Sequence, residues 1–305
     1  MWDISGDMMK NSKIAILCVM ASGALWGVIS FFIRALDAGG LNSLQISFVR
    51  MFVSVVVFTL FVLIKDKSKF KIKLKDLWMF AGTGIVSIVV FNGLYFYTMI
   101  NSQTSVAVVL LYTSPVFIMI LSAFLFKEKI TVKKIIALVL TVMGCACATG
   151  LVGSGYKIKP FVLLMGLGAG LFYALYTIFG RVALEKYDTL TVTVYSFIFG
   201  LFGSLFVGKP IETTKILIHN PSLILWGIGV GIVCTVMPYF LYTYGLQRIE
   251  SGKAAIIVAV EPVVATVIGI LCYGDDCSVV KILGIVFILV SIVLLNMKSK
   301  NEKIK

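Results

Sequence analysis

Charged residues are scarce in this sequence of 305 residues: Asp, Glu, Lys and Arg make up 13% of it, against about 25% in ordinary soluble domains. Hydrophobic side chains make up 60%, and the charged residues stand in short clusters between long apolar runs. A soluble globule needs more polar residues to cover its surface, so the composition excludes one. The sequence therefore predicts a chain whose solvent is lipid.

Histidine, and pairs of groups that catalyse reactions, are lacking as well. The single histidine, His219, lies outside the apolar runs, and no two acids share the centre of a run. A membrane enzyme needs a nucleophile with its base, two carboxylates or a metal cluster, and the spacing of Cys145 and Cys147 does not suit zinc. We therefore expect no enzyme, no metal and no cofactor. Basic clusters in such a chain indicate membrane topology rather than nucleic-acid binding.

Ten apolar runs stand between charged or turn residues, and a membrane-spanning helix needs about 20 residues. They cover residues 14–33, 43–63, 77–99, 105–126, 134–151, 161–182, 189–206, 223–246, 254–273 and 280–297. The first run is longer than the apolar part of a secretory signal, about 7–15 residues, so we interpret it as a retained span. The predicted fold class is all-α, a polytopic membrane protein with ten transmembrane helices.

Lysine and arginine are distributed unevenly over the connections between these runs. With the amino terminus in the cytoplasm, 20 of the 27 fall in inside segments and six in outside segments, while Arg50 lies within a run. Basic residues accumulate in cytoplasmic loops. The bias predicts a multi-pass protein of the plasma (inner) membrane with both termini in the cytoplasm.

The most basic connection runs from Lys65 to Lys75, where six lysines alternate with other residues, among them Phe70, Ile72 and Leu74. Such a segment can lie extended on anionic lipid head groups. It can equally be an anchor that fixes topology and has no other purpose. The sequence leaves both interpretations open.

The two halves of the chain are similar to each other. A shift of 147 residues superposes Gly23 on Gly170, Phe32 on Phe179, Arg34 on Arg181, Gly84 on Gly231, Tyr95 on Tyr242, Tyr97 on Tyr244, Pro115 on Pro262 and Lys134 on Lys281. Each copy holds five predicted helices, and an odd number inverts the second copy in the membrane. Inverted repeats are a signature of secondary transporters, in which the two halves alternate access to a site near the midplane.

This duplication sets the predicted organisation of the chain. We expect a cytoplasmic tail over 1–13, a first five-helix repeat over 14–151, a linker over 152–160, a second, inverted repeat over 161–297 and a cytoplasmic tail over 298–305. The predicted architecture is therefore two inverted five-helix repeats joined by a short linker.

At this point the pattern resembles the drug/metabolite transporter superfamily, in its EamA-type branch with two fused five-helix repeats. The resemblance covers residues 14–297 and rests on Leu25-Trp26-Gly27, on Arg50, on Tyr112-Thr113-Ser114-Pro115 running to Lys127-Glu128-Lys129, and on Val260-Glu261-Pro262-Val263 running to Gly274-Asp275. It implies an exporter or carrier of small metabolites, amino acids included, that has no ATP-binding domain. The chain departs from the pattern at Asp275-Asp276, where the ninth span of the family ends in an acid and a base, and at Phe197, the image of Arg50.

Glu261 lies near the middle of the ninth predicted span. An ionised acid there costs about 2.5–3.5 kcal/mol even on a low insertion scale, so something must compensate for it. Glu261 is therefore a candidate proton carrier or ligand of a substrate amine. The alternative is a structural acid that bonds backbone groups freed by Pro262.

Arg50 is the other charged residue inside a predicted span. Its guanidinium keeps its proton and offers a planar fork of donors. It can pair with Glu261 or bind a substrate carboxylate. The alternative is that its stem runs along the helix and brings the charge to the interface.

The remaining candidates are prolines, aromatic residues and one amide. Pro115 and Pro262 interrupt equivalent spans and free carbonyls that can line a cavity, or they only shape the helices. The candidates for the substrate-binding site are completed by Trp26, Asn92, Tyr112, Tyr173, Tyr176 and Tyr239, each of which can instead pack between helices. We assign Tyr95, Tyr97, Tyr242 and Tyr244 to the interfacial belts and expect Glu128 and Asp275 to be solvated or locally paired.

The function that these residues favour is a secondary transporter that exports a small organic metabolite. Its partners are a small-molecule substrate and the lipid bilayer, and its energy source is the proton gradient acting through Glu261 or the substrate's own gradient. The alternatives are a channel or structural membrane protein, or a membrane-embedded enzyme. A channel needs a continuous polar lining, which the few polar residues of the spans do not supply.

Overall fold

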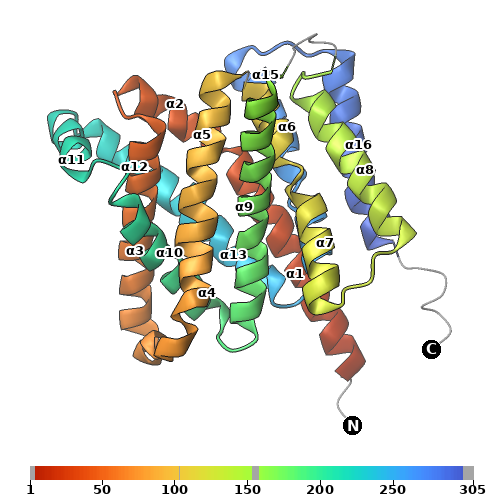
Figure 1. Cartoon of the computed structure of the whole chain (residues 1–305), viewed down its shortest axis with the longest axis horizontal. Helices are drawn as coiled ribbons and strands as arrows, with labels where there is room; N and C mark the ends of the chain where they lie inside the picture. The colour runs from red at the N-terminus through yellow and green to blue at the C-terminus, as the bar shows by residue number, and fades with distance from the viewer. Residues whose placement is uncertain (1–3, 103, 153–157, 298–305) are drawn as a thin grey trace.

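The structure, a computed structural model, describes residues 4–102, 104–152 and 158–297. Within these ranges the chain forms helices and connections and no strand. The helices run up and down a single bundle, in which α1 starts and α16 ends toward the same lower end (Figure 1). The predicted carboxyl-terminal tail, 298–305, and most of the predicted linker lie outside the described residues.

The first half of the chain contributes the helices α1 to α8. They are α1 (Ile4–Gly27), α2 (Ile29–Ala38), α3 (Ser43–Lys65), the 3₁₀ turns η1 (Lys67–Phe70) and η2 (Leu74–Asp76), α4 (Leu77–Ala81), the π-helix η3 (Gly82–Val90), α5 (Phe91–Asn101), α6 (Thr104–Leu111), α7 (Ser114–Phe126) and α8 (Val132–Ala148). Asn42 caps α3 with its side chain, and Gln45 bonds back to the Asn42 N–H, so the sequence starts this helix with a capping box.

The second half contributes the helices α9 to α16. They are α9 (Pro160–Leu184), α10 (Thr189–Ser204), α11 (Pro210–His219), α12 (Ser222–Gly231), the π-helix η4 (Ile232–Val236), α13 (Met237–Leu246), α14 (Ser251–Ile257), α15 (Val260–Tyr273) and α16 (Val279–Asn296). The sequence predicted no helix between the seventh and eighth spans, but α11 forms there. It begins with Pro210 in its first turn, where the missing N–H has no helical partner to lose.

Eight helical segments of the described residues are long and apolar enough to cross a membrane. They are Ser12–Ala38, Ser43–Lys65, Leu74–Asn101, Ser105–Phe126, Pro160–Leu184, Ser222–Leu246, Ser251–Tyr273 and Val279–Asn296. The two other predicted spans form the shorter helices α8, with 17 residues, and α10, with 16. At 1.5 Å per residue these fall somewhat short of the hydrocarbon thickness of about 30 Å. The chain is thus an all-helical, polytopic membrane protein.

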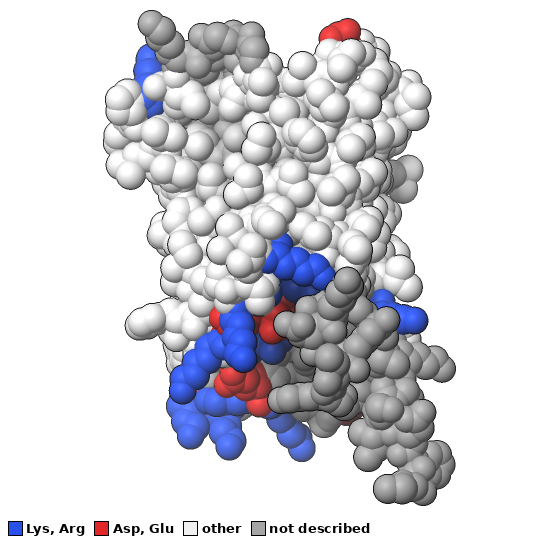
Figure 2. Space-filling model, turned by 90° about the vertical axis from the view of Figure 1, so that its right-hand side faces the viewer, with Lys and Arg blue, Asp and Glu red and all other residues white. Residues whose placement is uncertain are grey.

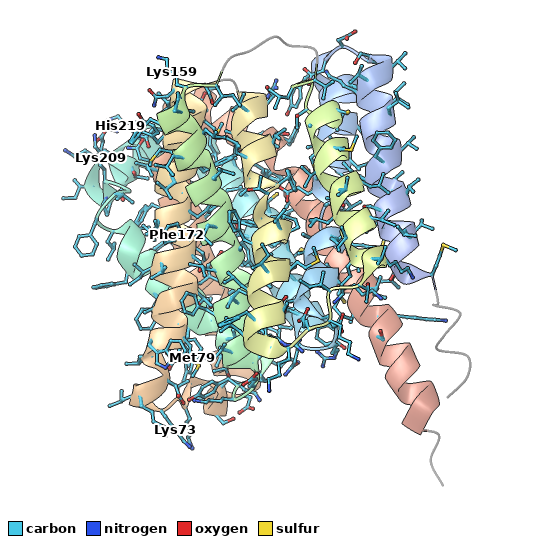
Figure 3. The ribbon with its side chains drawn as sticks, turned by 45° about the vertical axis from the view of Figure 1, so that its right-hand side comes forward. Lys73, Met79, Lys159, Phe172, Lys209 and His219 are labelled. Carbon is cyan, nitrogen blue, oxygen red and sulfur yellow. The ribbon has the colours of Figure 1, made fainter. Side chains whose placement is uncertain are left out.

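The outer surface of the bundle has the character that a bilayer requires. Large apolar side chains project outward, among them Phe124, Ile100 and Leu271 with 84%, 83% and 78% of their surface exposed. Figure 2 shows a broad surface with little charge above a lower end where lysine, arginine and acidic residues gather. Lys73 lies at the lower end and Lys159 at the upper end, with Phe172 between them (Figure 3). An apolar surface of this extent is stable only against lipid.

The two halves have the same local irregularities. The break between α6 and α7 falls at Tyr112 and Thr113, and the break between α14 and α15 falls at Val258 and Ala259. The predicted interruptions near Pro115 and Pro262 are therefore present as two-residue breaks within otherwise helical spans. The π-helices η3 and η4 also overlap when the halves are superposed by 147 residues. Such π segments are frequent at functional sites.

Glycines let each half approach the helix break of the other half. A Cβ on Gly23 of α1 would lie 2.5 Å from the Val258 carbonyl oxygen at the α14–α15 break. A Cβ on the equivalent Gly170 of α9 would lie 2.9 Å from the Leu110 carbonyl oxygen and 2.6 Å from the Thr113 Oγ1 at the α6–α7 break. The small residues thus serve close helix packing, as is common in membranes.

Helices α8 and α16 lie side by side at one edge of the bundle (Figure 1). Thr141 and Ser291 share a hydrogen bond of 2.9 Å, and a Cβ on Gly144 would lie within 3.1 Å of Ile288. From the first pair to the second, the residue number rises along α8 and falls along α16, so the two helices are antiparallel. The shift of 147 residues places Thr141 on Ile288 and Gly144 on Ser291, so it converts one pair into the other. The equivalent helices of the two halves therefore pack antiparallel about an approximate two-fold axis.

The prediction that Glu128 is solvated or locally paired is wrong. Its carboxylate accepts the N–H of Ser251 at 2.7 Å and the N–H of Gly252 at 3.2 Å, at the start of α14. The first N–H groups of a helix have no partner within it and carry a partial positive charge, so an acid binds them well. A residue more than 120 positions away in the sequence supplied this partner, which is why the sequence did not indicate it.

Candidate functional site

A cavity with aromatic walls, called the aromatic cavity below, lies between helices of both halves. Its volume in this structure is about 20 Å³, room for little more than one water molecule. It is lined by Trp26, Ser87, Ile88, Phe91, Tyr173, Tyr176, Thr177, Tyr239 and Tyr242. These residues come from α1, η3, α5, α9 and α13. Ligand sites are typically mostly apolar concavities with a few polar groups, and this cavity has that character.

Tyr239 lies at the centre of the aromatic contacts. Its ring meets those of Trp26, Tyr176 and Phe197 edge to face, with centroids 5.0, 5.1 and 5.0 Å away. Edge-to-face contacts of this kind fix ring orientation and add about 0.5–1.5 kcal/mol each beyond burial. The walls of the cavity are therefore held in one geometry by their own packing.

Two hydrogen bonds tie α9 to α13 beside the cavity. The hydroxyls of Tyr176 and Thr243 are 3.1 Å apart, and those of Thr177 and Tyr242 are 2.8 Å apart. Tyr242 is 4% exposed, so its assignment to an interfacial belt is wrong. It lies three residues from Tyr239 on the same face of α13, and this spacing is the signal that could have placed it in the site.

Glu261 lies in the first turn of α15, directly after the helix break. Its carboxyl interacts with the Tyr112 hydroxyl and lies within electrostatic reach of Tyr173 and Tyr95. Gly27 backs this turn, since a Cβ there would lie 2.7 Å from the Glu261 carbonyl oxygen. The start of a helix favours an anion, which partly compensates for placing an acid inside the bundle.

Arg50 lies on α3 and does not line the cavity. Its Nε donates to Thr235 Oγ1 at 3.0 Å, and the Thr235 hydroxyl donates to the Val230 carbonyl within the π turn. Arg50 and Glu261 both act electrostatically on Tyr239 and on each other, but no ion pair within 4.0 Å joins them in the described part of the chain. The direct pairing of Arg50 with Glu261 that the sequence offered as one alternative is not formed.

The structure brings together some of the predicted site residues and separates others. Trp26, Tyr173, Tyr176 and Tyr239 line the cavity, and Tyr112 and Glu261 adjoin it through Tyr173. The Asn92 amide donates to Ser47 Oγ at 2.9 Å and does not line the cavity. Pro115 and Pro262 are buried at the starts of α7 and α15, where they shape the breaks and line nothing.

Four further lining residues were missed by sequence reasoning: Ser87, Ile88, Phe91 and Thr177. Thr177 adjoins Tyr176 and lies one turn from Tyr173, so helical spacing could have indicated it. Ser87 and Ile88 face the cavity because η3 is a π-helix, in which the Ser87 hydroxyl donates to the Gly82 carbonyl five residues earlier. Ordinary helical spacing does not predict the face that such a turn presents.

The fold is that of a polytopic membrane protein with an aromatic cavity between helices of its two halves. The chain matches the EamA-like transporter family twice, over residues 13–150 and 160–297, and it belongs to that family. The two matched segments begin 147 residues apart, the same interval as the shift that superposes the halves. Family membership identifies the chain as a membrane transporter.

Related proteins carry names that agree with this family. An uncharacterized transporter of Archaeoglobus fulgidus is 26% identical over 276 residues, which cover 90% of this chain and 94% of the relative. The uncharacterized inner membrane transporter YicL of Salmonella typhimurium is 23% identical and covers 96% of this chain and 99% of the relative. A solved crystal structure shares the fold with a TM-score of 0.76 over 92% of this chain and 96% of that one, at 15% identity.

Proposed function

We propose that this chain is a secondary active transporter that exports a small, amino-acid-like metabolite by alternating access around the aromatic cavity, with proton coupling through Glu261. The observation that supports it is that one acid, Glu261, and one guanidinium, Arg50, both act electrostatically on Tyr239 in the wall of the aromatic cavity and form no ion pair with each other among the described residues. Charged groups inside a membrane protein are costly and mark substrate and ion pathways. A substrate with two opposite charges can satisfy both.

The two charged groups suit the two ends of a zwitterion. Glu261 offers a carboxylate for an ammonium group, while Arg50 uses only its Nε on Thr235 among the described residues. Its terminal nitrogens can therefore take a substrate carboxylate through two parallel hydrogen bonds. The rings of Trp26 and Tyr239 in the cavity wall suit an apolar side chain or, through their faces, a cation.

Proton coupling follows from competition at a single carboxyl. Glu261 binds the ammonium group only when ionised, and a proton that enters from the opposite side of the membrane displaces the substrate. The groups that face Glu261 are Tyr112, Tyr95, Tyr173, Cys145, Tyr239 and Arg50. Arg50 is the cation among them, and it stabilises the ionised carboxyl from a distance.

Alternating access requires two halves that exchange conformations. We propose that α8 and α10 complete ten membrane spans in two inverted repeats, since they occupy the positions of α16 and α3 when the halves are superposed. The excess of basic residues at the lower end supports a cytoplasmic lower end in a plasma (inner) membrane. Thiol labelling of single cysteines at Lys73 and Lys159 from each side of vesicles tests this topology, and labelling of both from one side would contradict it.

The transport proposal is tested in proteoliposomes that contain the purified protein. Amino acids, nucleosides and quaternary amines are screened as labelled substrates with and without a pH gradient. We expect saturable flux of a zwitterionic amine, counterflow, and at least tenfold faster flux with the gradient than without it. A flux that neither saturates nor shows counterflow would indicate a channel and contradict the proposal.

Glu261→Gln tests whether this carboxyl carries both the substrate ammonium and the proton. Gln keeps the size of the side chain but neither ionises nor releases a proton, so we expect gradient-driven flux to fall by about 100-fold, as for loss of a group essential to the cycle. The matched control is Glu212→Gln on exposed α11, which should leave flux unchanged. Gradient-driven flux that persists in Glu261→Gln would remove this residue from the mechanism.

A further inference from the structure

The lower end of the bundle carries a basic groove that the transport site does not use. It is lined by Lys71, Ile72, Lys73, Lys75, Asp76, Lys186 and Tyr187, and it has about 920 Å³ of space open to solvent. The lysines come from the connection between α3 and α4 and from the turn between α9 and α10. This groove, called the basic groove below, is therefore built from both halves of the chain.

The basic groove holds an excess of positive charge that the protein does not neutralise. Its only acid, Asp76, is 2% exposed and accepts Lys186 Nζ at 2.7 Å and the Tyr187 hydroxyl at 2.8 Å. Lys71, Lys73 and Lys75 are exposed and form no ion pair among the described residues. Three amino groups that surround one open space form a site for an anion with several oxygen atoms, such as a phosphate.

The backbone that presents these lysines is fixed to the rest of the bundle. The Lys73 N–H donates to the Tyr187 hydroxyl at 3.0 Å, the Tyr195 hydroxyl donates to the Phe70 carbonyl at 2.8 Å, and the Thr191 hydroxyl donates to the Lys69 carbonyl at 3.1 Å. A segment that only fixes topology by its charge needs no such bonds. A preorganised segment loses little conformational entropy when a ligand binds it.

Apolar residues beside the groove place it at the surface of the bilayer. Phe70 and Ile72 pack inward against the core, whereas Leu74 is 82% exposed and Trp78 is 52% exposed. Leu74 is also the first residue of a membrane-spanning segment. Tryptophan is enriched at the level of the lipid head groups, and an exposed leucine is stable when lipid covers it.

We infer that the basic groove binds the phosphate of an anionic phospholipid of the lower leaflet, with Lys71, Lys73 and Lys75 on the head group and Leu74 and Trp78 against its acyl chains. A soluble phosphate explains the lysines but not the two exposed apolar side chains beside them. The images of Lys71, Lys73 and Lys75 in the second half are Ile218, Asn220 and Ser222, which carry no charge. The site is therefore specific to one end of the molecule.

The test measures lipid binding by the purified full-length protein in a neutral detergent. Short-chain phosphatidylglycerol is titrated, with phosphatidylcholine and inorganic phosphate as comparison ligands, and binding is followed by thermal stabilisation and by native mass spectrometry. The variant carries Lys71→Gln, Lys73→Gln and Lys75→Gln. The matched control carries Lys159→Gln, Lys209→Gln and Lys215→Gln, which remove the same charge from the upper end.

The groove variant should bind phosphatidylglycerol at least about tenfold more weakly, since each lysine near a lipid surface contributes severalfold in affinity. The control should stay within about threefold of the parent, and arginine at all three groove positions should restore binding. Equal losses in both variants would show that net charge alone attracts the lipid and would overturn the inference. Equal binding of phosphatidylcholine, or full displacement by millimolar inorganic phosphate, would overturn it as well.

Discussion

The lower and upper ends of the bundle are built from equivalent residues but are joined in different ways. At the lower end, Lys134 and Glu128 of the first half bond to the start of α14 in the second half, and Arg181 bonds to the end of α13. At the upper end, the equivalent Lys281 bonds within its own connection, and Arg34 contacts the Tyr273 ring. Part of the difference is conformational, because Arg34, Lys281 and Asp275 repeat Arg181, Lys134 and Glu128 at corresponding positions. Part of it is in the sequence, because the image of Glu250 is Gln103, which carries no charge.

Three charged side chains form these bonds at the lower end. The Arg181 guanidinium donates to the carbonyls of Leu246 and of Ile249, the latter at 3.0 Å, where α13 ends. Lys134 Nζ pairs with Glu250 at 2.6 Å, and Glu128 caps α14. Cations stabilise the free carbonyls at the end of a helix, and anions stabilise the free N–H groups at its start.

Equivalent residues at the upper end have other partners. Arg34, the image of Arg181, lies over the ring of Tyr273 with its guanidinium carbon 3.7 Å from the ring centre. Lys281, the image of Lys134, donates to the Asp276 carbonyl of its own connection at 2.8 Å. We infer that the contacts at the lower end hold it closed, and that the alternating access proposed above requires them to break.

Arg181→Ala should weaken the lower end more than any other single change. It leaves two carbonyls without their charged donor, which costs about 2–3 kcal/mol, so the closed lower end should open more often by well over tenfold. The measurement is labelling of Ser87→Cys in the aromatic cavity by an impermeant thiol reagent, in a background without other cysteines. Labelling from the lower side should accelerate.

Arg34→Ala is the matched control for that experiment. It removes one cation–π contact, worth about 0.5–1 kcal/mol at an exposed site, and it leaves the lower end intact. Labelling from the lower side should stay at the rate of the parent. Equal acceleration of this labelling in both alanine variants would contradict the claim that Arg181, and not Arg34, stabilises the lower end.

Glu128→Ala should have the next largest effect. Ser251 and Gly252 lose the acceptor of their N–H groups, and loss of a helix cap costs about 1–2 kcal/mol. We expect a lower melting temperature in detergent and labelling from the lower side that is faster by about tenfold. Glu128→Gln keeps one oxygen acceptor, so its melting temperature and its labelling rate should lie between those of the parent and of Glu128→Ala. Asp275→Asn, at the image position, should leave labelling from the lower side unchanged.

Much of the fold follows from the sequence because lipid imposes simple rules. Runs of apolar residues predicted the helical segments, and the matched Pro115 and Pro262 predicted the places where two of them break. The aromatic residues Trp26, Tyr173, Tyr176 and Tyr239 were predicted for the site because they lie toward the middle of their runs, and they do line the cavity. Position along a span thus predicts depth reasonably well.

The rest depends on contacts between segments that are distant in sequence. Tyr242 was assigned to an interface by its position near the end of a run, but α1 and α9 pack around this part of α13 and bury it. The role of Glu128 depends on a helix that starts more than 120 residues later. The side chains of η3 that face the cavity are set by its π-helical turns, and the spacing of apolar residues in the sequence does not reveal such turns.

The Lys134–Glu250 pair should contribute the smallest but most specific difference between the ends. Lys134 and Lys281 each donate to a carbonyl of their own connection, at 2.9 and 2.8 Å, so the alanine variants lose the same local bond. Only Lys134 also binds an acid, and because the Glu250 side chain is 53% exposed the pair should be worth about 0.5–1 kcal/mol. A double-mutant cycle of Lys134→Ala and Glu250→Ala, read by thermal stability and by labelling of Ser87→Cys, should give this coupling energy. Lys281→Ala combined with Glu250→Ala should give none, and an equal coupling there would show that Glu250 acts through the net charge of the protein rather than through a bond that closes the lower end.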